Sequence, residues 1–166
     1  AQVTRGVAFV RERYFVMADK LEPLEETTHE YRYRIHAFAG YDLDGEVTLE
    51  AHGPHIKRDN GALQIFTAST AESIAHEEPP YTPLFVPHVH NLIGDEGDHT
   101  VTDSVSMGIA PDFLTILAPY KTGTESGEHA PLTVTSIQTS TGATAWLIES
   151  EGHQDVAWIR ENNSAT

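Results

Sequence analysis

The sequence predicts an all-β protein, an antiparallel β-sandwich of the jelly-roll or supersandwich kind, in a single domain spanning residues 1–166. Three observations favour this class. The apolar runs are short and lie between turn signals, residues 30–39 alternate between two chemical characters, and no segment has the pattern of a long helix. A chain of this length buries roughly two-thirds of its unfolded surface, so it needs neither disulfides nor a structural metal to fold.

Strands and turns are predicted from runs of apolar and β-branched residues and from the residues that separate them. The first two strands flank a short charged turn and should form a hairpin. Asp44-Gly45, Asn60-Gly61 and Thr141-Gly142 each fall between apolar runs, which favours three further hairpin turns. Strands are predicted at residues 3–10, 14–21, 30–39, 47–52, 62–68, 100–106, 113–119, 132–138, 143–148 and 156–159.

Two segments are predicted to be loops. Residues 77–87 carry four prolines, which cannot donate to a central ladder, and residues 121–131 are rich in Gly, Thr, Ser and Glu. Neither composition marks a domain boundary, so the single-domain prediction stands.

The strand at residues 30–39 carries the predicted substrate-binding residues. Its alternation places Tyr31, Tyr33, Ile35 and Ala37 on a core-like face and the remaining residues of the strand on a solvent-facing side. Arg32, Arg34 and His36 form a row on that solvent-facing side. They could bind carboxylates or sulfates through charge-assisted hydrogen bonds. The alternative is that these side chains pair with some of the chain's many acidic residues and shield the sheet.

A metal site is a second candidate. His88 and His90 would point the same way on a strand, as two ligands of one divalent metal ion would. His99 would add a third ligand and leave an open coordination position. The alternative is structural, since Pro87 and Gly94 flank the pair and His-x-His alone is a weak signal. A comparison with cupins is poor, because the glycines and the second histidine motif of that family are missing.

Other polar patterns are predicted to be structural. His52 and His55 lie at a strand end and probable turn, and we expect both to belong to the surface. The chain has no Gly-x-Ser-x-Gly elbow, no phosphate-binding glycine loop and no cysteine, so nucleophilic and nucleotide chemistry are not expected. Tyr31 and Trp146 are candidate exposed aromatic contacts for a glycan.

The charge excludes some partners. With a net charge of -15 the chain should not bind nucleic acid or anionic membranes, which Lys and Arg would have to neutralise. No apolar run is long enough to span a membrane. The acidic, lysine-poor composition suits a marine or saline setting, and the start at Ala1-Gln2 leads us to expect a processed or excised product.

The opening segments resemble a known family. The hairpin at residues 7–21, followed by the His29-Glu-Tyr-Arg-Tyr-Arg-Ile-His36 strand, is similar to the sandwich of heparinase II/III-type polysaccharide lyases. In that family a hairpin strand ending in Asp precedes a strand carrying His-x-Tyr and then His. Residues 110–119 and 152–160 resemble later strands of the same sandwich.

The resemblance implies a partner and a reaction. In that family a helical toroid supplies most catalytic groups, and the sandwich completes the cleft with a histidine and can hold a metal. The reaction it implies is β-elimination beside a uronate carboxyl, which needs a base and a group that stabilises the developing anion. No catalytic residue is implied in this chain, because the family's histidine motif would lie before Val7.

We therefore expect a non-catalytic β-sandwich module that supports or binds acidic polysaccharide, with a helical domain as the other possible partner and no activity alone. A small metal-dependent jelly roll centred on His88 and His90 is the alternative. A third possibility is a structural domain that forms homo-oligomers through exposed sheet edges. We expect a periplasmic or extracellular location.

Overall fold

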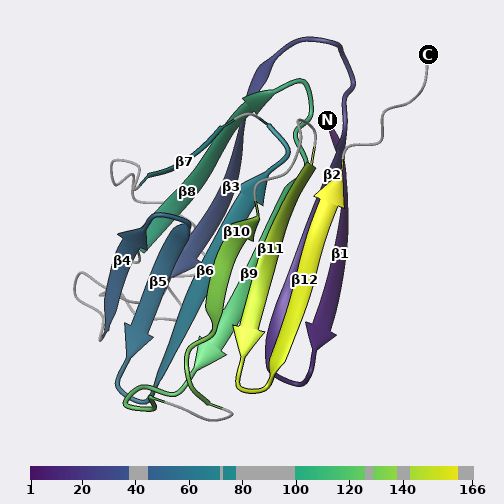
Figure 1. Ribbon diagram of the computed structural model, residues 1–166. Coiled ribbons are helices and arrows are strands. Elements are labelled where there is room, and N and C mark those ends of the chain that lie inside the picture. The colour runs from purple at the N-terminus through teal and green to yellow at the C-terminus, as the bar shows by residue number, and fades with distance from the viewer. Residues whose placement is uncertain (38–44, 72, 78–99, 126–128, 138–142, 161–166) are drawn as a thin grey trace.

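The computed structural model describes residues 1–37, 45–71, 73–77, 100–125, 129–137 and 143–160, and over these residues it is built of β-strands without helices (Figure 1). The all-β prediction is confirmed. The strands are β1 (Gln2–Val10), β2 (Tyr14–Glu22), β3 (His29–Ala37), β4 (Glu46–Glu50), β5 (Gly53–Arg58), β6 (Gly61–Ser69), β7 (Ile74–Glu77), β8 (Thr100–Gly108), β9 (Phe113–Tyr120), β10 (Thr133–Ile137), β11 (Ala143–Ser150) and β12 (His153–Arg160).

A six-stranded antiparallel sheet in the order β1-β2-β9-β6-β5-β4 forms the middle of the molecule. Its central strand β9 is buried on both faces over residues 113–116, which explains why that sequence is apolar without alternating. Gly53, at the start of β5, has a φ of 138°, and its missing side chain lets the carbonyl of Ile65 approach closely.

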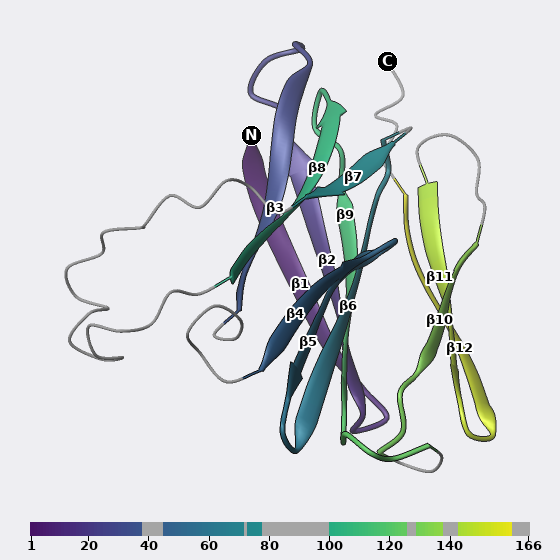
Figure 2. The same ribbon diagram turned by 90° about the vertical axis from the view of Figure 1, so that its left-hand side faces the viewer.

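Two three-stranded sheets cover opposite faces of this central sheet, as Figure 2 shows for the β10-β11-β12 layer on one side. Trp146 of β11 packs against Phe66 of β6 with ring centroids 6.1 Å apart. On the other side, Tyr33 of β3 contacts Phe113 of β9, and Ser69 is hydrogen-bonded to Ser106 of β8. Because odd and even residues of a strand point to opposite faces, the two small sheets lie on different sides.

The main hydrophobic core lies between the central sheet and the β10-β11-β12 sheet. It gathers Tyr14, Phe66, Ala68, Leu114, Ile116, Ala118, Leu132, Trp146, Ile148 and Ile159. The Tyr14 hydroxyl donates to Asp155 of β12, and Arg11 in the β1–β2 turn binds the same carboxylate at 2.7 and 2.9 Å. These bonds fix the first hairpin against the last one.

Most strand predictions agree with the structure, and the differences have physical reasons. The hairpins β1–β2, β5–β6 and β10–β11 are confirmed. The predicted strand at residues 47–52 runs past its end, because Ala51 and His52 form the turn into β5, a strand that we did not predict. The turn signal at Asp44-Gly45 closes no hairpin, since β3 and β4 belong to different sheets.

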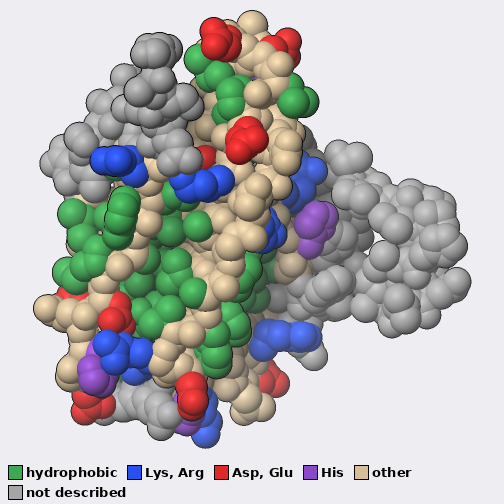
Figure 3. All heavy atoms as spheres, turned by 90° about the vertical axis from the view of Figure 1, so that its right-hand side faces the viewer, with side chains coloured by type: hydrophobic (Ala, Val, Ile, Leu, Met, Phe, Trp, Pro, Cys, Tyr) green, Lys and Arg blue, Asp and Glu red, His purple; other side chains and the backbone are tan. Residues whose placement is uncertain are grey.

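Two edge strands lie at one side of the sandwich and carry exposed apolar side chains. β1 is an edge of the central sheet and β12 is an edge of the small sheet beside it. Viewed from this side, hydrophobic side chains gather along the edge (Figure 3). Val3, Val7 and Phe9 of β1 and Val156 and Trp158 of β12 are all more than half exposed. In the described part of the chain, no helix could cross a membrane.

Candidate functional site

The face of β3 that was predicted to bind substrate is exposed. The burial of β3 alternates as expected, with Arg32, Arg34 and His36 exposed and Tyr31, Tyr33 and Ile35 half-buried. β3 pairs with β8, and this register places Arg34 directly beside Asp103. The side chain of Asp103 is 0% exposed although it lies on this same face, because the two arginines cover it.

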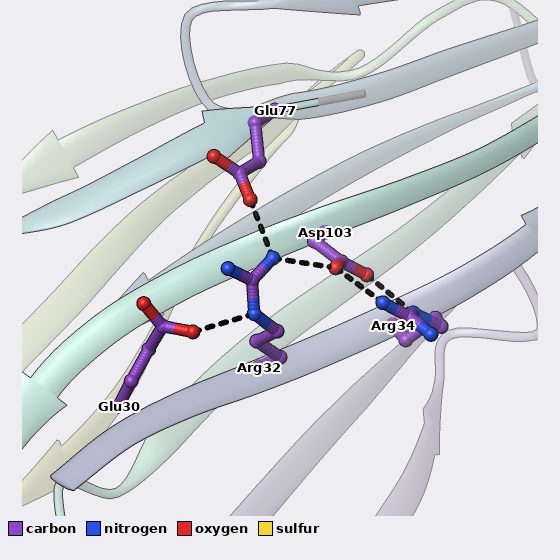
Figure 4. A network of polar contacts seen from close by, with 5 residues as sticks. All are labelled: Glu30, Arg32, Arg34, Glu77 and Asp103. Atoms are coloured by element: carbon purple, nitrogen blue, oxygen red, sulfur yellow. Dashed lines mark hydrogen bonds and ion pairs between the residues drawn. The ribbon is translucent and has the colours of Figure 1, made fainter. Parts of the chain in front are cut away.

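Asp103 binds both arginines at once (Figure 4). Its two carboxylate oxygens accept from Nε and Nη2 of Arg34 at 2.7 Å each, which is the bidentate geometry of a strong pair. Nη1 of Arg32 donates to Oδ2 of the same carboxylate at 3.0 Å. One buried carboxylate therefore holds two guanidinium groups next to each other.

Arg32 also joins all three strands of this small sheet. Its Nε donates to Glu30 of β3 at 2.7 Å, and its Nη1 donates to Glu77 of β7. The hydrogen bonds from Arg34 lower the pKa of Asp103 below its ordinary value; burial opposes this shift, and the bond from Arg32 adds to it. The bonds to Glu30, Asp103 and Glu77 raise the pKa of Arg32. Asp103, Arg32 and Arg34 are thus charged at neutral pH.

The network leaves part of each arginine available. Nη2 of Arg32 and Nη1 of Arg34 have no hydrogen-bond partner among the described residues, and the two side chains are 36% and 42% exposed. The pairing of the arginines with acidic residues, which we weighed as the alternative, is present. A role for Arg32, Arg34 and His36 in binding a glycan stays a prediction.

The other predicted contacts fall in different places. Trp146 is 1% exposed and belongs to the core, so it is not available to a ligand, and Trp158 is the exposed tryptophan at 67%. The hydroxyl of Tyr31 donates to the carbonyl of Ile109. The predicted metal ligands His88, His90 and His99 lie outside the described residues. Within the described ranges, no three His, Cys, Asp or Glu side chains are grouped to hold a metal.

Three hydrogen-bonded polar side chains link β4, β5 and β9, and the sequence did not predict this group. His55 accepts or donates at 2.8 Å to Glu50 through Nδ1 and at 2.8 Å to the Tyr120 hydroxyl through Nε2. His55 is buried, so the expectation that it belongs to the surface is wrong. Sequence spacing could not reveal this group, because Tyr120 is brought to His55 by the order of the strands.

Two comparisons with known proteins find no match to this chain. A scan against protein-family models finds no match to the chain. A search of curated proteins finds no match either. The function proposed below is therefore inferred from the residues and their arrangement.

Proposed function

We propose that this chain is a non-catalytic β-sandwich module, related to that of heparinase II/III-type polysaccharide lyases, that supports or binds acidic polysaccharide. One observation carries this proposal. Arg32 and Arg34 are held side by side on an exposed sheet face by the buried Asp103, with one amino group of each turned to no protein partner among the described residues. Two oriented donors on a flat face suit the carboxylate or sulfate groups of an extended glycan.

Fixed arginines reduce the cost of binding. A free arginine loses side-chain entropy when a ligand immobilises it, whereas Arg34 is already immobilised by its two bonds to Asp103. The network carries a net negative charge, because Asp103, Glu30 and Glu77 outnumber the two arginines. An anionic group of a glycan would therefore be held by directed hydrogen bonds and not by overall electrostatic attraction. We therefore expect weak, saturable binding that requires anionic groups on the glycan.

Binding without cleavage is the test of this function. Incubation with a panel of uronate-containing polysaccharides should give a saturable binding isotherm and no rise in ultraviolet absorbance from unsaturated products. Arg34→Ala should weaken binding about fivefold, the scale of an exposed charge pair. Arg160→Ala, which removes an exposed arginine on β12, is the matched control and should bind as the original chain does.

Two results would contradict the proposal. An absorbance rise would show that the chain cleaves the polysaccharide by itself. Equal binding to a neutral polysaccharide such as dextran would show that anionic groups are not recognised.

Self-assembly is a second candidate, favoured by the apolar edge of the sandwich. No other strand of the described residues pairs with the outer edge of β1 along its nine residues, and its one charged side chain, Arg5, is neutralised by Asp19 at 2.6 Å. Two copies of a chain with a net charge of -15 repel each other, so contact is favoured at this uncharged edge. The occupant that fits is β1 of a second copy, paired antiparallel.

Light scattering during size exclusion tests this candidate. The chain should elute as a dimer with twice the mass of 18.3 kDa at high concentration. Val7→Lys should restore the monomer, because the lysine places a charge on the exposed face of β1. Leu24→Lys alters an exposed apolar residue in the connection between β2 and β3, outside β1, and should not. Elution at 18.3 kDa at every concentration would refute self-assembly.

A further inference from the structure

Most basic side chains of this acidic protein form ion pairs or hydrogen bonds. The described ones that form neither are concentrated at one end of the central sheet. Arg5, Arg11, Lys20, Arg32 and Arg34 each form an ion pair with a carboxylate. Among the described residues, four lysines and arginines have neither an ion pair nor a side-chain hydrogen bond. Three of the four lie at the β5–β6 hairpin and the end of β9: Lys57, Arg58 and Lys121.

A surface hollow lies at the same end of the central sheet. Its volume is about 550 Å³, within the range of small-ligand sites. Ile56, Leu63 and Pro119 line it and stand opposite one another on the neighbouring strands β5, β6 and β9. They therefore share one face of the sheet and give the hollow an apolar floor.

Polar groups line the rest of the hollow. Arg58 lines it and lies two residues after Ile56 on β5, hence on the same face, and Asn60 lies in the hairpin turn. The Thr122 hydroxyl donates to the carbonyl of Asp59 at 2.7 Å, which fixes the segment after β9 against the hairpin. That bond places Lys121 at this end of the sheet as well. Asp59 contributes one opposing charge.

We infer that this hollow binds an anionic sugar ring of the acidic polysaccharide. The ring packs its C–H face on the apolar floor, and Arg58 and Lys121 bind its carboxylate or sulfate. This inference rests on the proposed function and names a second contact site for the same glycan. The cations here are available, whereas those of the Arg32–Arg34 pair are largely offset by carboxylates.

Amide chemical shifts of the full ¹⁵N-labelled chain locate the site. Glucuronate is the small probe, glucose is its neutral counterpart, and a uronate polysaccharide is the large probe. Glucuronate should shift the amides of Gly61, Leu63 and Tyr120, and glucose should not. Arg58→Ala should weaken glucuronate binding about tenfold, the loss of one hydrogen bond to a charged group.

Three variants make this result specific. Lys121→Ala should weaken binding less than Arg58→Ala, because a lysine offers a point charge without the two-pronged geometry of arginine. Arg58→Lys should restore part of the affinity. Arg160→Ala is again the matched control, since Arg160 is the fourth of the described basic residues that have neither an ion pair nor a side-chain hydrogen bond. An amide spectrum of each unbound variant that changes only near the substituted residue shows that the fold is intact.

The outcomes separate this inference from the proposed function. Shifts confined to the amides of β3 and β8, with Arg58→Ala equal to Arg160→Ala, would overturn the hollow as a site and leave glycan binding in place. Binding of glucuronate at the hollow without binding of any polysaccharide would support the hollow and refute the function. No binding of either probe would overturn both.

Discussion

Replacing Trp146 by alanine is expected to lower the free energy of unfolding by about 3–5 kcal/mol, the usual range for removing a large aromatic side chain from a core. Trp146 is the largest of the fully buried side chains. Its ring packs edge-to-face against Phe66 and His52, with interplanar angles of 64° and 76°, and its indole nitrogen donates to the carbonyl of Leu114 at 3.4 Å. The substitution opens a cavity between the two sheets and leaves that carbonyl without its side-chain donor.

Urea unfolding measures this effect, and Trp158→Ala is the matched control. Trp158 lies on the neighbouring strand β12 but is 67% exposed, so its removal should change stability by no more than about 0.5 kcal/mol. Equal losses for the two variants would contradict the placement of Trp146 between the sheets.

Replacing Asp103 by asparagine is expected to lower the free energy of unfolding by about 2 kcal/mol at neutral pH, because hydrogen bonds to charged groups are lost and solvent partly screens the exposed arginines. Asparagine keeps the size of the side chain but turns an amide donor toward guanidinium donors. Arg32 and Arg34 then lose the group that orients them. Glycan binding should weaken in the same variant, as we also expect for Arg34→Ala.

The pH dependence of this difference has a defined sign. Because Arg34 and Arg32 lower the pKa of Asp103 in the folded state, its contribution is fully present above the unfolded pKa, about 3.9. The contribution is lost as the pH falls through the lower folded value. Urea unfolding at pH 7 should therefore separate the original chain from Asp103→Asn, and the gap should narrow below about pH 4. A gap that widens in acid would contradict the assigned charge state.

The exposed face of β3 shows which features of the site follow from the sequence and which do not. Alternation along β3 correctly placed Arg32, Arg34 and His36 on the exposed face, because side-chain direction follows from strand geometry alone. The partner of the two arginines could not be read in the same way. Asp103 lies on β8, 69 residues beyond Arg34, and only the pairing of β3 with β8 brings them together.

Which of the two tryptophans is buried could not be predicted from the sequence either. Both lie on predicted strands, and apolar residues occur on both faces of β11, so the pattern does not say which face meets the core. The register decides it, since Trp146 stands opposite Ala157 and Trp158 therefore points to the other face. His55 entered the interior for a similar reason, through partners on β4 and β9.

Local periodicity and turn chemistry are enough to predict the all-β class, most strand positions, three hairpins and the exposed face of β3. Long-range packing sets the remaining features, which are the sheet order, the buried tryptophan, the Asp103 network, the hydrogen bonds of Glu50, His55 and Tyr120, and the hollow beside Arg58. Each of these joins strands that are distant in the chain. Local pattern sets the direction of a side chain, and the packing of whole sheets sets its neighbours.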